Sequence, residues 1–478
     1  MIDRSRSRFS RRAFLTGAVV GGAGMWAAGV MPHWLASRNA KRPPKLYEYF
    51  VDNYWFESAN LYETRINPPL KGRQRADVAI VGGGFAGMST AYNLATRLPG
   101  KRIVLLEGAR CGYGASGRNG GFADLGMPGV ESVYETQGPE AARAYYDATR
   151  LGLEQIRTFV RDYGVDCELE STGSTMLAAE ESHIERLLEE KARYDRMGIE
   201  LELFDKAALR GRLISERFVA GLHDPNHAIV NPAKLARGMK DVIELLGVEV
   251  SERSKVMQIH AGSTVRVVTE FAEVLADQVV IALNGYAPQI GQYRQRILPV
   301  AGYIAATEPL DEARMQSIGW AGRDGLWDTR PEFMYLRLSA DNRIVFGGEG
   351  GQIFYDSDPS SGNYQPVLDE LYHSLLVTFP QLEGVRFTHA WGGTLGITKD
   401  GMPSVGSVGD APNLYHAVGF NGEGVVMTQL AGRIVAEMIA KQESPLAELA
   451  IVDKPMPYIG PEPIRSAAAL LTRRLRHW

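Results

Sequence analysis

The hydrophobic pattern is clearest between Ala76 and Leu98, where the chain reads ADVAIVGGGFAGMSTAYNLATRL. An uninterrupted apolar run from Val78 to Val81 predicts a buried strand, and the glycines behind it predict a turn. The apolar residues that follow recur at helical spacing. A second apolar run, RIVLLE at 102–107, predicts the next strand. The pattern therefore predicts a strand, a turn, a helix and a second, parallel strand.

Later runs with strand-like composition fall into two groups. The runs at 244–252 and 276–288 are expected in the same sheet as the first two strands. Further segments combine strand composition with turn residues and predict a second, mixed or antiparallel sheet: STGSTMLAA (171–179), RFVAGLHDPNHAIVNP (217–232), ILPVAGYIAATEP (297–309) and FMYLRLSADNRIVFGG (333–348). A final helix, expected within 425–440, returns the chain to the first unit. The predicted fold class is α/β, with two domains interleaved along the sequence.

The N-terminus has a different pattern. Five arginines lie within the first twelve residues, and the span from Ala13 to Ser37 then contains no Asp, Glu, Lys or Arg. A basic region before an apolar one is typical of export signals, and Ser-Arg-Arg-Ala-Phe-Leu at 10–15 resembles the twin-arginine signal. The alternative is a plain basic N-terminus ahead of a membrane anchor. No clean Ala-x-Ala motif follows Trp26, which is compatible with an uncleaved segment that tethers the protein, and whether the signal is cleaved is left open.

The expected domain boundaries follow from these patterns. The segments, in chain order, are a signal or anchor (1–37), a linker (38–75), first-domain residues (76–165), second-domain residues (166–230), first-domain residues (231–290), second-domain residues (291–385), first-domain residues (386–445) and a C-terminal tail (446–478). A chain of 478 residues that is 45% hydrophobic is long enough for both cores.

Charge and cysteine content narrow the function classes. The net charge is −4, with no basic stripe of the kind that binds nucleic acid. The two cysteines, Cys111 and Cys167, are too few for a stapled scaffold or a four-cysteine zinc site, and whether they pair is left open. We expect no metal and no nucleic-acid partner. The tail from Ser466 to Trp478 predicts either an amphipathic helix on anionic lipid or a solvated terminus.

The glycines after the first strand form a dinucleotide-binding fingerprint. Gly82, Gly84 and Gly87 give G-x-G-x-x-G between a strand and a helix, and Glu107 ends the next strand. In this pattern the glycines allow a tight turn, close backbone approach to a pyrophosphate and close packing of helix on strand. The helix N-terminus directs its free N–H groups at the phosphates. The acidic residue is expected to accept the ribose hydroxyls, which predicts NAD or FAD.

The next segment favours FAD. GARCGYGASGRNGG at 108–121 holds six glycines directly after the second strand, which suits close backbone passage over a large flat cofactor. With these motifs the chain resembles the D-amino-acid oxidase superfamily, and within it the gamma-glutamylputrescine oxidoreductase group. The resemblance is most specific at Gly114–Gly121 and continues at 335–348, 378–385 and 431–439.

That resemblance implies a Rossmann-type FAD-binding domain interleaved with a smaller substrate domain. Noncovalent FAD is expected, because nothing specific supports a thioether at Cys111. The fingerprint and the resemblance together predict FAD contacts at Gly82, Gly84, Phe85, Ala86, Gly87, Glu107, Gly108, Ser116, Gly117, Arg118, Asn119, Gly120, Val256, Asn284, Gly285, Gly422, Gly424 and Val425. Arg118 is open to two interpretations, a flavin or substrate contact or a solvated loop charge.

Candidate catalytic residues are Arg337, Tyr335 and Glu423. Arg337 and Tyr335 should project from one face of a strand, where an Arg fork would hold a substrate carboxylate; the alternative for Arg337 is an ion pair at a surface or between domains. Many relatives have Gly-His-Gly where this chain has Gly422, Glu423 and Gly424. Glu423 would attract a cationic amine if it faces the pocket, and would only cap the helix start if it faces solvent.

The resemblance implies an FAD-dependent oxidoreductase that oxidises the C–N bond of an amine or amino acid, with a gamma-glutamyl-amine among the candidates, and the N-terminal pattern predicts that this enzyme is exported. Hydride would pass from the carbon beside the nitrogen to flavin, the imine would hydrolyse, and oxygen or a quinone would accept the electrons. Two alternatives remain: a membrane-anchored amino-acid deaminase that feeds the respiratory chain, and a catalytically silent FAD-binding subunit. The expected partners are the small-molecule substrate and the twin-arginine export machinery.

Export can be tested at Arg11 and Arg12. The twin-arginine route carries folded proteins, so the double Arg→Lys variant should keep its FAD but remain in the cytoplasm, because the receptor reads both arginines. Fractionation of cells expressing each version, with flavin fluorescence measured in each fraction, checks this. Equal export of the variant would identify the segment as a simple anchor, and retention of both versions in the cytoplasm would refute export.

Overall fold

The computed structural model describes residues 53–291, 293–330, 333–353, 365–461, 464–465 and 467. The segment with Arg11 and Arg12, and nearly all of the predicted tail helix, lie outside the described residues. Within the described part of the chain, no helix is long and apolar enough to cross a membrane. In the same part, no group of three or more His, Cys, Asp or Glu residues is arranged to hold a metal ion.

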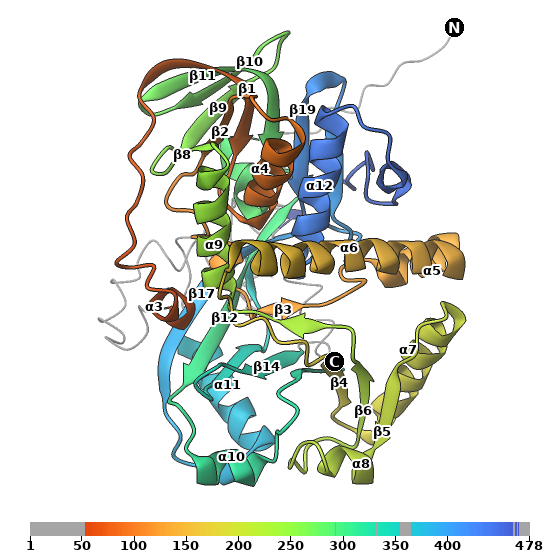
Figure 1. Cartoon of the computed structure of the whole chain (residues 1–478). Coiled ribbons are helices and arrows are strands. Elements are labelled where there is room, and N and C mark those ends of the chain that lie inside the picture. The colour runs from red at the N-terminus through yellow and green to blue at the C-terminus, as the bar shows by residue number, and fades with distance from the viewer. Residues whose placement is uncertain are drawn as a thin grey trace, which may run out of the picture. The chain divides into compact units, whose positions relative to one another are not determined.

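The first sheet is the predicted parallel one. Its main strand order is β18-β19-β11-β1-β2-β8. Strands β11, β1, β2 and β8 run parallel to one another. Strand β10 pairs antiparallel with β11, and β9 pairs antiparallel with β10. This sheet lies in the upper part of Figure 1. The strands are β1 (Gly72–Val81), β2 (Ile103–Leu106), β8 (Glu249–Ser251), β9 (Val256–His260), β10 (Val265–Thr269), β11 (Ala272–Ile281), β18 (Ser404–Val408) and β19 (Ala411–Val418).

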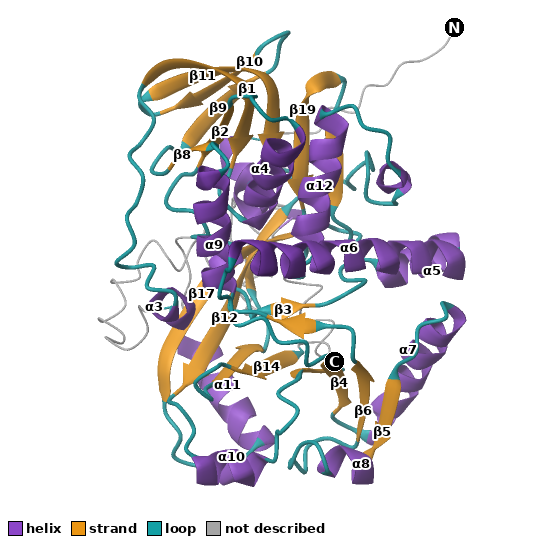
Figure 2. Cartoon of the chain, in the orientation of Figure 1, coloured by secondary structure: helices purple, strands orange, loops and turns teal. Residues whose placement is uncertain are grey.

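Helices cover this sheet and set the cofactor-binding edge. Helix α4 (Phe85–Arg97) follows β1 and packs against α12 (Met427–Ile439) and α9 (Pro232–Leu245), as Figure 2 shows. The approach of α12 to α4 is close, since a Cβ added at Gly432 would lie 2.4 Å from Ser89 Oγ. The long helix α6 (Pro139–Tyr163) also contacts α12, and α5 (Val130–Gln137) precedes it.

The second sheet is mixed, as predicted. Its order is β16-β12-β15-β14-β13-β4-β6-β5, with β17 also paired to β12, and only the β13–β4 pair is parallel among the pairs described. The strands are β4 (Ser174–Ala178), β5 (Glu202–Asp205), β6 (Ala220–Asp224), β12 (Leu298–Thr307), β13 (Gly325–Asp328), β14 (Met334–Leu338), β15 (Ile344–Gly348), β16 (Gln352–Ile353) and β17 (Phe387–Ile397). Its helices are α7 (Ile184–Arg196), α8 (Lys206–Arg210), α10 (Glu312–Ile318) and α11 (Gln365–Thr378).

The sheet pairings correct two of the expected boundaries. Strand β17 falls in the segment 386–445 that was assigned to the first domain, yet it pairs with β12 from Leu298 to Thr307, so it belongs to the second sheet. The expectation failed because a long strand with buried and half-buried positions can join either sheet. The segment 38–75 is not a linker throughout, since it contains helix α3 (Tyr54–Ser58) and the start of β1.

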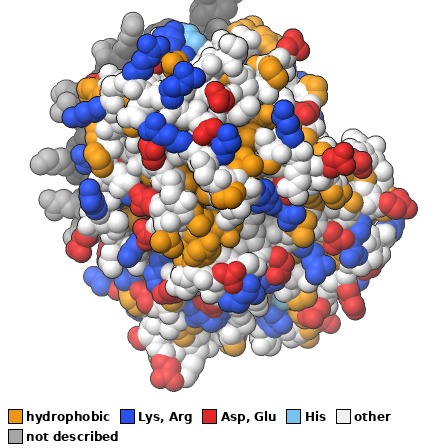
Figure 3. Space-filling view, turned by 45° about the horizontal axis from the view of Figure 1, so that its top comes forward, with side chains coloured by type: hydrophobic (Ala, Val, Ile, Leu, Met, Phe, Trp, Pro, Cys, Tyr) orange, Lys and Arg blue, Asp and Glu red, His pale blue; other side chains and the backbone are white. Residues whose placement is uncertain are grey.

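A small ribbon connects the two domains. Strands β3 (Phe122–Ala123) and β7 (Ala228–Ile229) pair antiparallel, with Phe122 opposite Ile229. In the view of Figure 1 this ribbon lies between the two large sheets. The residue after β3, Asp124, and the residue before β7, His227, are consequently brought side by side. On the face drawn in Figure 3, Lys and Arg side chains are interspersed with Asp and Glu, and hydrophobic side chains gather near the middle.

Candidate cofactor and substrate site

A cavity of about 320 Å³ lies at the carboxyl ends of β1, β2 and β11. This is the edge of an α/β sheet where ligands bind, because the loops that leave the strands diverge there. Residues from the second sheet, Thr394 and Leu395 of β17, also line the cavity. A molecule that fills it therefore touches both domains.

The turn after β1 has the geometry that the fingerprint predicts. Gly82 has φ of +113°, and a Cβ added at Gly87 would lie 1.9 Å from the Gly82 carbonyl oxygen. Only glycine at both positions allows this crossing. Gly84 is the N-cap of α4 and brings no capping side chain. Gly84, Phe85 and Ala86 line the cavity, so the N-terminus of α4 faces it, as an anion-binding site requires, and Ser116 Oγ accepts from Phe85 N at 2.8 Å.

Glu107 lies at the end of β2 in the same cavity. Its carboxylate accepts hydrogen bonds from Gly83 N at 2.7 Å and Ala109 N at 2.8 Å, which fix its orientation. Burial raises the pKa of Glu107, while these backbone N–H groups act in the opposite direction. A carboxylate fixed beside a glycine turn and a helix N-terminus fits the adenosine and pyrophosphate part of a dinucleotide.

The glycine-rich loop is held in place by residues distant in sequence. Asn53 Nδ2 donates to Gly117 O at 3.0 Å, and the indole of Trp55 donates to Asn119 O at 2.9 Å. From the other side, the indole of Trp391 donates to Arg118 O at 2.8 Å. These hydrogen bonds fix the backbone of the loop against the cavity. The sequence analysis missed Asn53 and Trp55, whose signal was an aromatic cluster just before the first strand.

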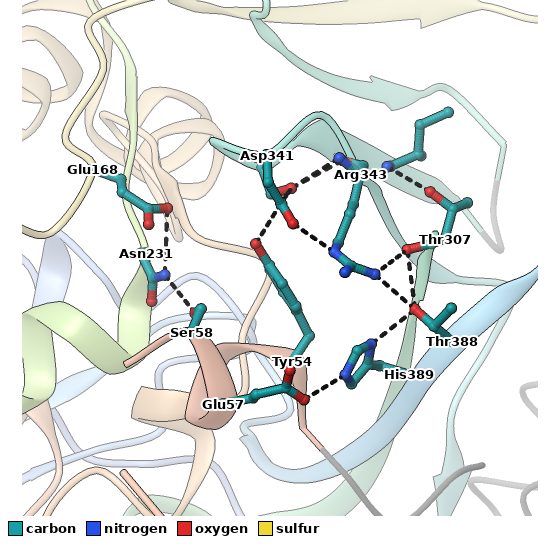
Figure 4. Close-up of polar contacts among 12 residues, drawn as sticks. Tyr54, Glu57, Ser58, Glu168, Asn231, Thr307, Asp341, Arg343, Thr388 and His389 are labelled. Atoms are coloured by element: carbon teal, nitrogen blue, oxygen red, sulfur yellow. Dashed lines mark hydrogen bonds and ion pairs between the residues drawn. The ribbon is translucent and has the colours of Figure 1, made fainter. Parts of the chain in front are cut away.

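Helix α3 is itself anchored by several elements of the second domain and by α9. Figure 4 shows Tyr54 donating to Asp341, Glu57 facing His389, and Asn231 donating to Ser58, with distances of 2.7, 2.8 and 2.9 Å between the bonded atoms. Asn231 is also the N-cap of α9. The loop that lines the cavity is thus tied to β17, to the β14–β15 hairpin and to α9 through one short helix.

Most of the predicted cofactor contacts line the cavity. These are Gly82, Gly84, Phe85, Ala86, Glu107, Gly108, Ser116, Asn119, Val256, Asn284, Gly422, Gly424 and Val425. Asn284 also orders the far loop, because its Oδ1 accepts from Gly419 N at 2.9 Å. Sequence reasoning missed further lining residues, which come mainly from loop and strand ends without a motif: Tyr113, Lys255, Tyr286, Gln289, Thr394, Leu395, Phe420 and Thr428.

Five predicted contacts are outside the lining: Gly87, Gly117, Arg118, Gly120 and Gly285. The four glycines are sites of close packing, where an added Cβ would meet Gly82 O, Gly112 O, Tyr335 or Leu395 O at 1.9 to 2.8 Å. The Arg118 guanidinium donates to Tyr113 O and Gly392 O and stacks on the rings of Phe56 and Tyr113. These residues shape the loops and do not face the cavity.

Arg337 is placed differently from the expectation of a substrate clamp. It is fully buried and is not among the lining residues. Its guanidinium donates to Val230 O at 2.6 Å and to Leu338 O at 3.1 Å, and it lies 5.2 Å from the ring centroid of Trp55. Burial lowers its pKa to about 10. Nε and Nη1 are therefore bonded to backbone carbonyls between the domains, while Nη2 is buried with no hydrogen-bond partner among the described residues.

Tyr335 and Glu423 are not among the residues that line the cavity either, but each adjoins a loop that lines it. Tyr335 packs edge-to-face on Phe122, with ring centroids 5.7 Å apart, and would meet a Cβ at Gly120 at 2.8 Å. Burial and then the charge of Glu423 raise the pKa of the Tyr335 phenol. Glu423 lies between Gly422 and Gly424, which both line the cavity. The alternative that Glu423 faces only solvent is thus disfavoured.

A charged cluster continues from Glu423 into the joint between the domains. His227 lies between Asp124 and Asp224, with N–O distances of 3.0 and 3.1 Å, and all three side chains are about nine-tenths buried. Burial alone lowers the pKa of His227, but the two carboxylates outweigh it and raise the pKa to about 10. His227 is consequently an imidazolium at neutral pH. Burial raises the pKa of Asp224, but the charge and hydrogen bond of His227, together with the hydrogen bonds from Asn226, outweigh it and keep that carboxylate ionised. Tyr146 also donates to Asp224.

Neither cysteine takes part in the site. Cys111 and Cys167 are both free and buried, so the question of their pairing is answered in the negative. Burial raises the pKa of the Cys111 thiol well above its ordinary value, which keeps it protonated and unreactive. Its sulfur instead packs against the backbone of the glycine turn, where a Cβ at Gly83 would lie 2.8 Å away.

The parallel sheet, the glycine turn, the fixed carboxylate and the two-domain cavity together define a dinucleotide-binding oxidoreductase of the flavoprotein class. Residues 77–438 match the family model described as DAO, FAD dependent oxidoreductase. The chain belongs to this family, and FAD is its cofactor.

Two curated relatives align with more than four-fifths of the chain. A probable oxidoreductase OrdL of Haemophilus influenzae is 32% identical over 87% of this chain and 94% of its own length. The gamma-glutamylputrescine oxidoreductase of Escherichia coli is 33% identical over 81% of this chain and 89% of its own length. Among solved structures, glycine oxidase from Geobacillus kaustophilus superposes with a TM-score of 0.67 and 22% identity, over 80% of this chain and 100% of that one, which shows the shared fold.

The close crossing at Gly87 predicts a specific sensitivity. A Gly87→Ala substitution should destabilise the protein by about 1–3 kcal/mol, because the added methyl overpacks against the Gly82 carbonyl, and the displaced turn should release FAD. FAD content and melting temperature of the purified variant check this. Gly302→Ala is the matched control, because its Cβ would meet only Leu395 Cδ1 at 3.5 Å. Equal FAD occupancy in both variants would contradict the geometry.

The His227 cluster predicts a pH dependence of stability. The folded-state pKa of about 10 is above the ordinary value of 6.5, so the imidazolium stabilises the fold fully below about pH 6.5, and this stabilisation is lost as the pH rises toward 10. The free energy of unfolding of the wild type should fall across that window. A His227→Gln variant should be less stable at pH 6.5 and should show a much shallower fall, as measured by urea unfolding. Parallel curves for both proteins would exclude His227 as the titrating group.

Proposed function

We propose that this protein uses FAD to oxidise a C–N bond of a small amine or amino acid. The observation that carries the proposal is the single cavity that begins at the nucleotide fingerprint and ends against the second domain, so that a bound dinucleotide reaches from Glu107 to the Gly422–Val425 loop. The named activities of the relatives in Escherichia coli and Geobacillus kaustophilus support the same chemical class. A gamma-glutamyl-amine is the finer candidate substrate, supported by the identity of 33% to the first of these.

The residues of the chain supply binding and orientation. The chemistry that FAD supplies when bound is acceptance of a hydride from the carbon beside the substrate nitrogen. Gly84, Phe85 and Ala86 would hold the pyrophosphate at the start of α4, and Glu107 would hold the ribose. The loop before α12 presents its backbone N–H groups near the cavity, where they favour developing negative charge. Tyr335 and Phe122 pack edge-to-face against Gly120 of the glycine-rich loop, where they would form an aromatic wall on the substrate side.

Location and electron acceptor extend the proposal. We propose export of the folded flavoprotein through its N-terminal segment, supported by Arg11, Arg12 and the uncharged run from Ala13 to Ser37. Association with the membrane, through that segment or through the basic C-terminal tail, belongs to the same proposal. Oxygen and a membrane quinone are the two candidate acceptors.

The function is tested with purified protein. We expect one FAD per chain, released on denaturation, and bleaching of the oxidised flavin band when amines are mixed with the protein in the absence of oxygen. Readmission of oxygen, or addition of a soluble quinone, then identifies the acceptor by the rate at which the band returns. Folded protein without FAD would refute the cofactor assignment, and FAD that no amine or amino acid reduces would indicate the silent subunit.

A further inference from the structure

We propose that Glu423, with Asp124 beside it, forms an anionic receptor for the ammonium group of the substrate, and that the protein therefore selects amines without a carboxylate on the reacting carbon over α-amino acids. The inference deepens the proposed amine oxidation and rests on it. It assigns to this chain a substrate class and the residues that choose it.

The position of Glu423 is set by the loop between β19 and α12. The loop is held by Asn284, whose side chain accepts from Gly419 N and Phe420 N at 2.9 and 3.3 Å. Gly422 and Gly424 line the cofactor cavity on either side of Glu423. Glu423 is half-buried between them, and burial and then the charge of Glu423 raise the pKa of the Tyr335 phenol on β14.

The charges around Glu423 come from the β3–β7 ribbon. Asp124 follows β3 and His227 precedes β7, and these are the charged groups that act on the Glu423 carboxyl within the described part of the chain. Burial first, then the negative charge of Asp124, raise the pKa of Glu423 to about 7, while His227 acts in the opposite direction. His227 is shared between Asp124 and Asp224. The carboxylates of Asp124 and Asp224 outnumber the one imidazolium, so the cluster is already negative, and the ionisation of Glu423 makes it more so.

A negative cluster in a half-buried, aromatic-walled site attracts a cation and repels an anion. An alkylammonium would satisfy Glu423 and pack its methylene groups on Tyr335 and Phe122. An α-amino acid would carry its carboxylate into the same space. The side chain that could have offset that charge, Arg337, donates instead to Val230 O and Leu338 O and lies beneath Gly121. The preference for amines over α-amino acids therefore follows from the negative charge of the cluster.

The experiment uses the FAD-loaded protein and a pair of ligands that differ by one carboxylate. n-Butylamine is norvaline without its carboxylate, and N-acetylputrescine adds an uncharged amide at the far end. Bleaching of the flavin band without oxygen gives an apparent affinity and a limiting rate for each ligand. The wild type should bind the two amines at least ~10-fold more tightly than either enantiomer of norvaline.

The Glu423→Gln variant removes the charge and keeps the shape. It should weaken the apparent affinity for the amines by ~10-fold or more, and it should reduce the preference for the amines over norvaline. The matched control is Glu443→Gln, an exposed acid-to-amide change outside the cavity lining, which should leave both affinities unchanged. If Glu423→Gln fails to retain FAD, Asp124→Asn provides the second variant, with the same direction of change expected.

The pH profile separates charge recognition from a structural role. In the wild type the apparent amine affinity should improve as the pH rises through about 7, where Glu423 ionises. In Glu423→Gln this increase of affinity with pH should be absent. Preference of the wild type for norvaline, or an unchanged profile in the variant, would overturn the proposal while leaving amine oxidation standing. Failure of every amine and amino acid to reduce the FAD would refute the proposed function and this inference with it.

Discussion

The structure depends on one close crossing, that of helix α4 over the end of β1. At this point the chain has no room for a side chain, since a Cβ at Gly87 would lie 1.9 Å from Gly82 O. The crossing determines where α4 begins and hence where its N-terminal N–H groups face. It also places Gly83 against Glu107, whose carboxylate accepts the Gly83 N–H. The parts of the cavity where we expect the phosphates and the ribose are therefore two consequences of one packing constraint.

The substrate side depends on contacts made over long sequence distances. Helix α3 and Trp391 fix the glycine-rich loop through hydrogen bonds to its carbonyls, and Arg337 fills the space beneath Gly121. The β3–β7 ribbon then carries Asp124 and His227 from the same loop region to the neighbourhood of Glu423. The rigidity of the cofactor loop and the charge of the substrate site thus arise from one junction between the domains.

The sequence predicted local features well and long-range ones poorly. The structure contains the βαβ unit and the glycine turn and places Glu107 in the cavity, because each of these features follows from spacing within about thirty residues. Arg337 shows the limit: strand periodicity gave its face correctly, but only the fold reveals that Val230 and Trp55 occupy that face. Strand β17 was assigned to the wrong domain for the same reason, since its partner β12 is about ninety residues away in sequence.

The central claim is that the cavity holds FAD with its reactive end against Glu423. A crystal structure of the FAD-loaded protein with tert-butylamine tests it most directly, because this amine has no hydrogen on the carbon beside nitrogen and cannot be oxidised. The account predicts the ribose on Glu107, the flavin ring beside Gly422–Val425, and the ammonium within hydrogen-bonding distance of the Glu423 carboxylate. A flavin ring bound elsewhere, or an ammonium held away from both Glu423 and Asp124, would contradict it.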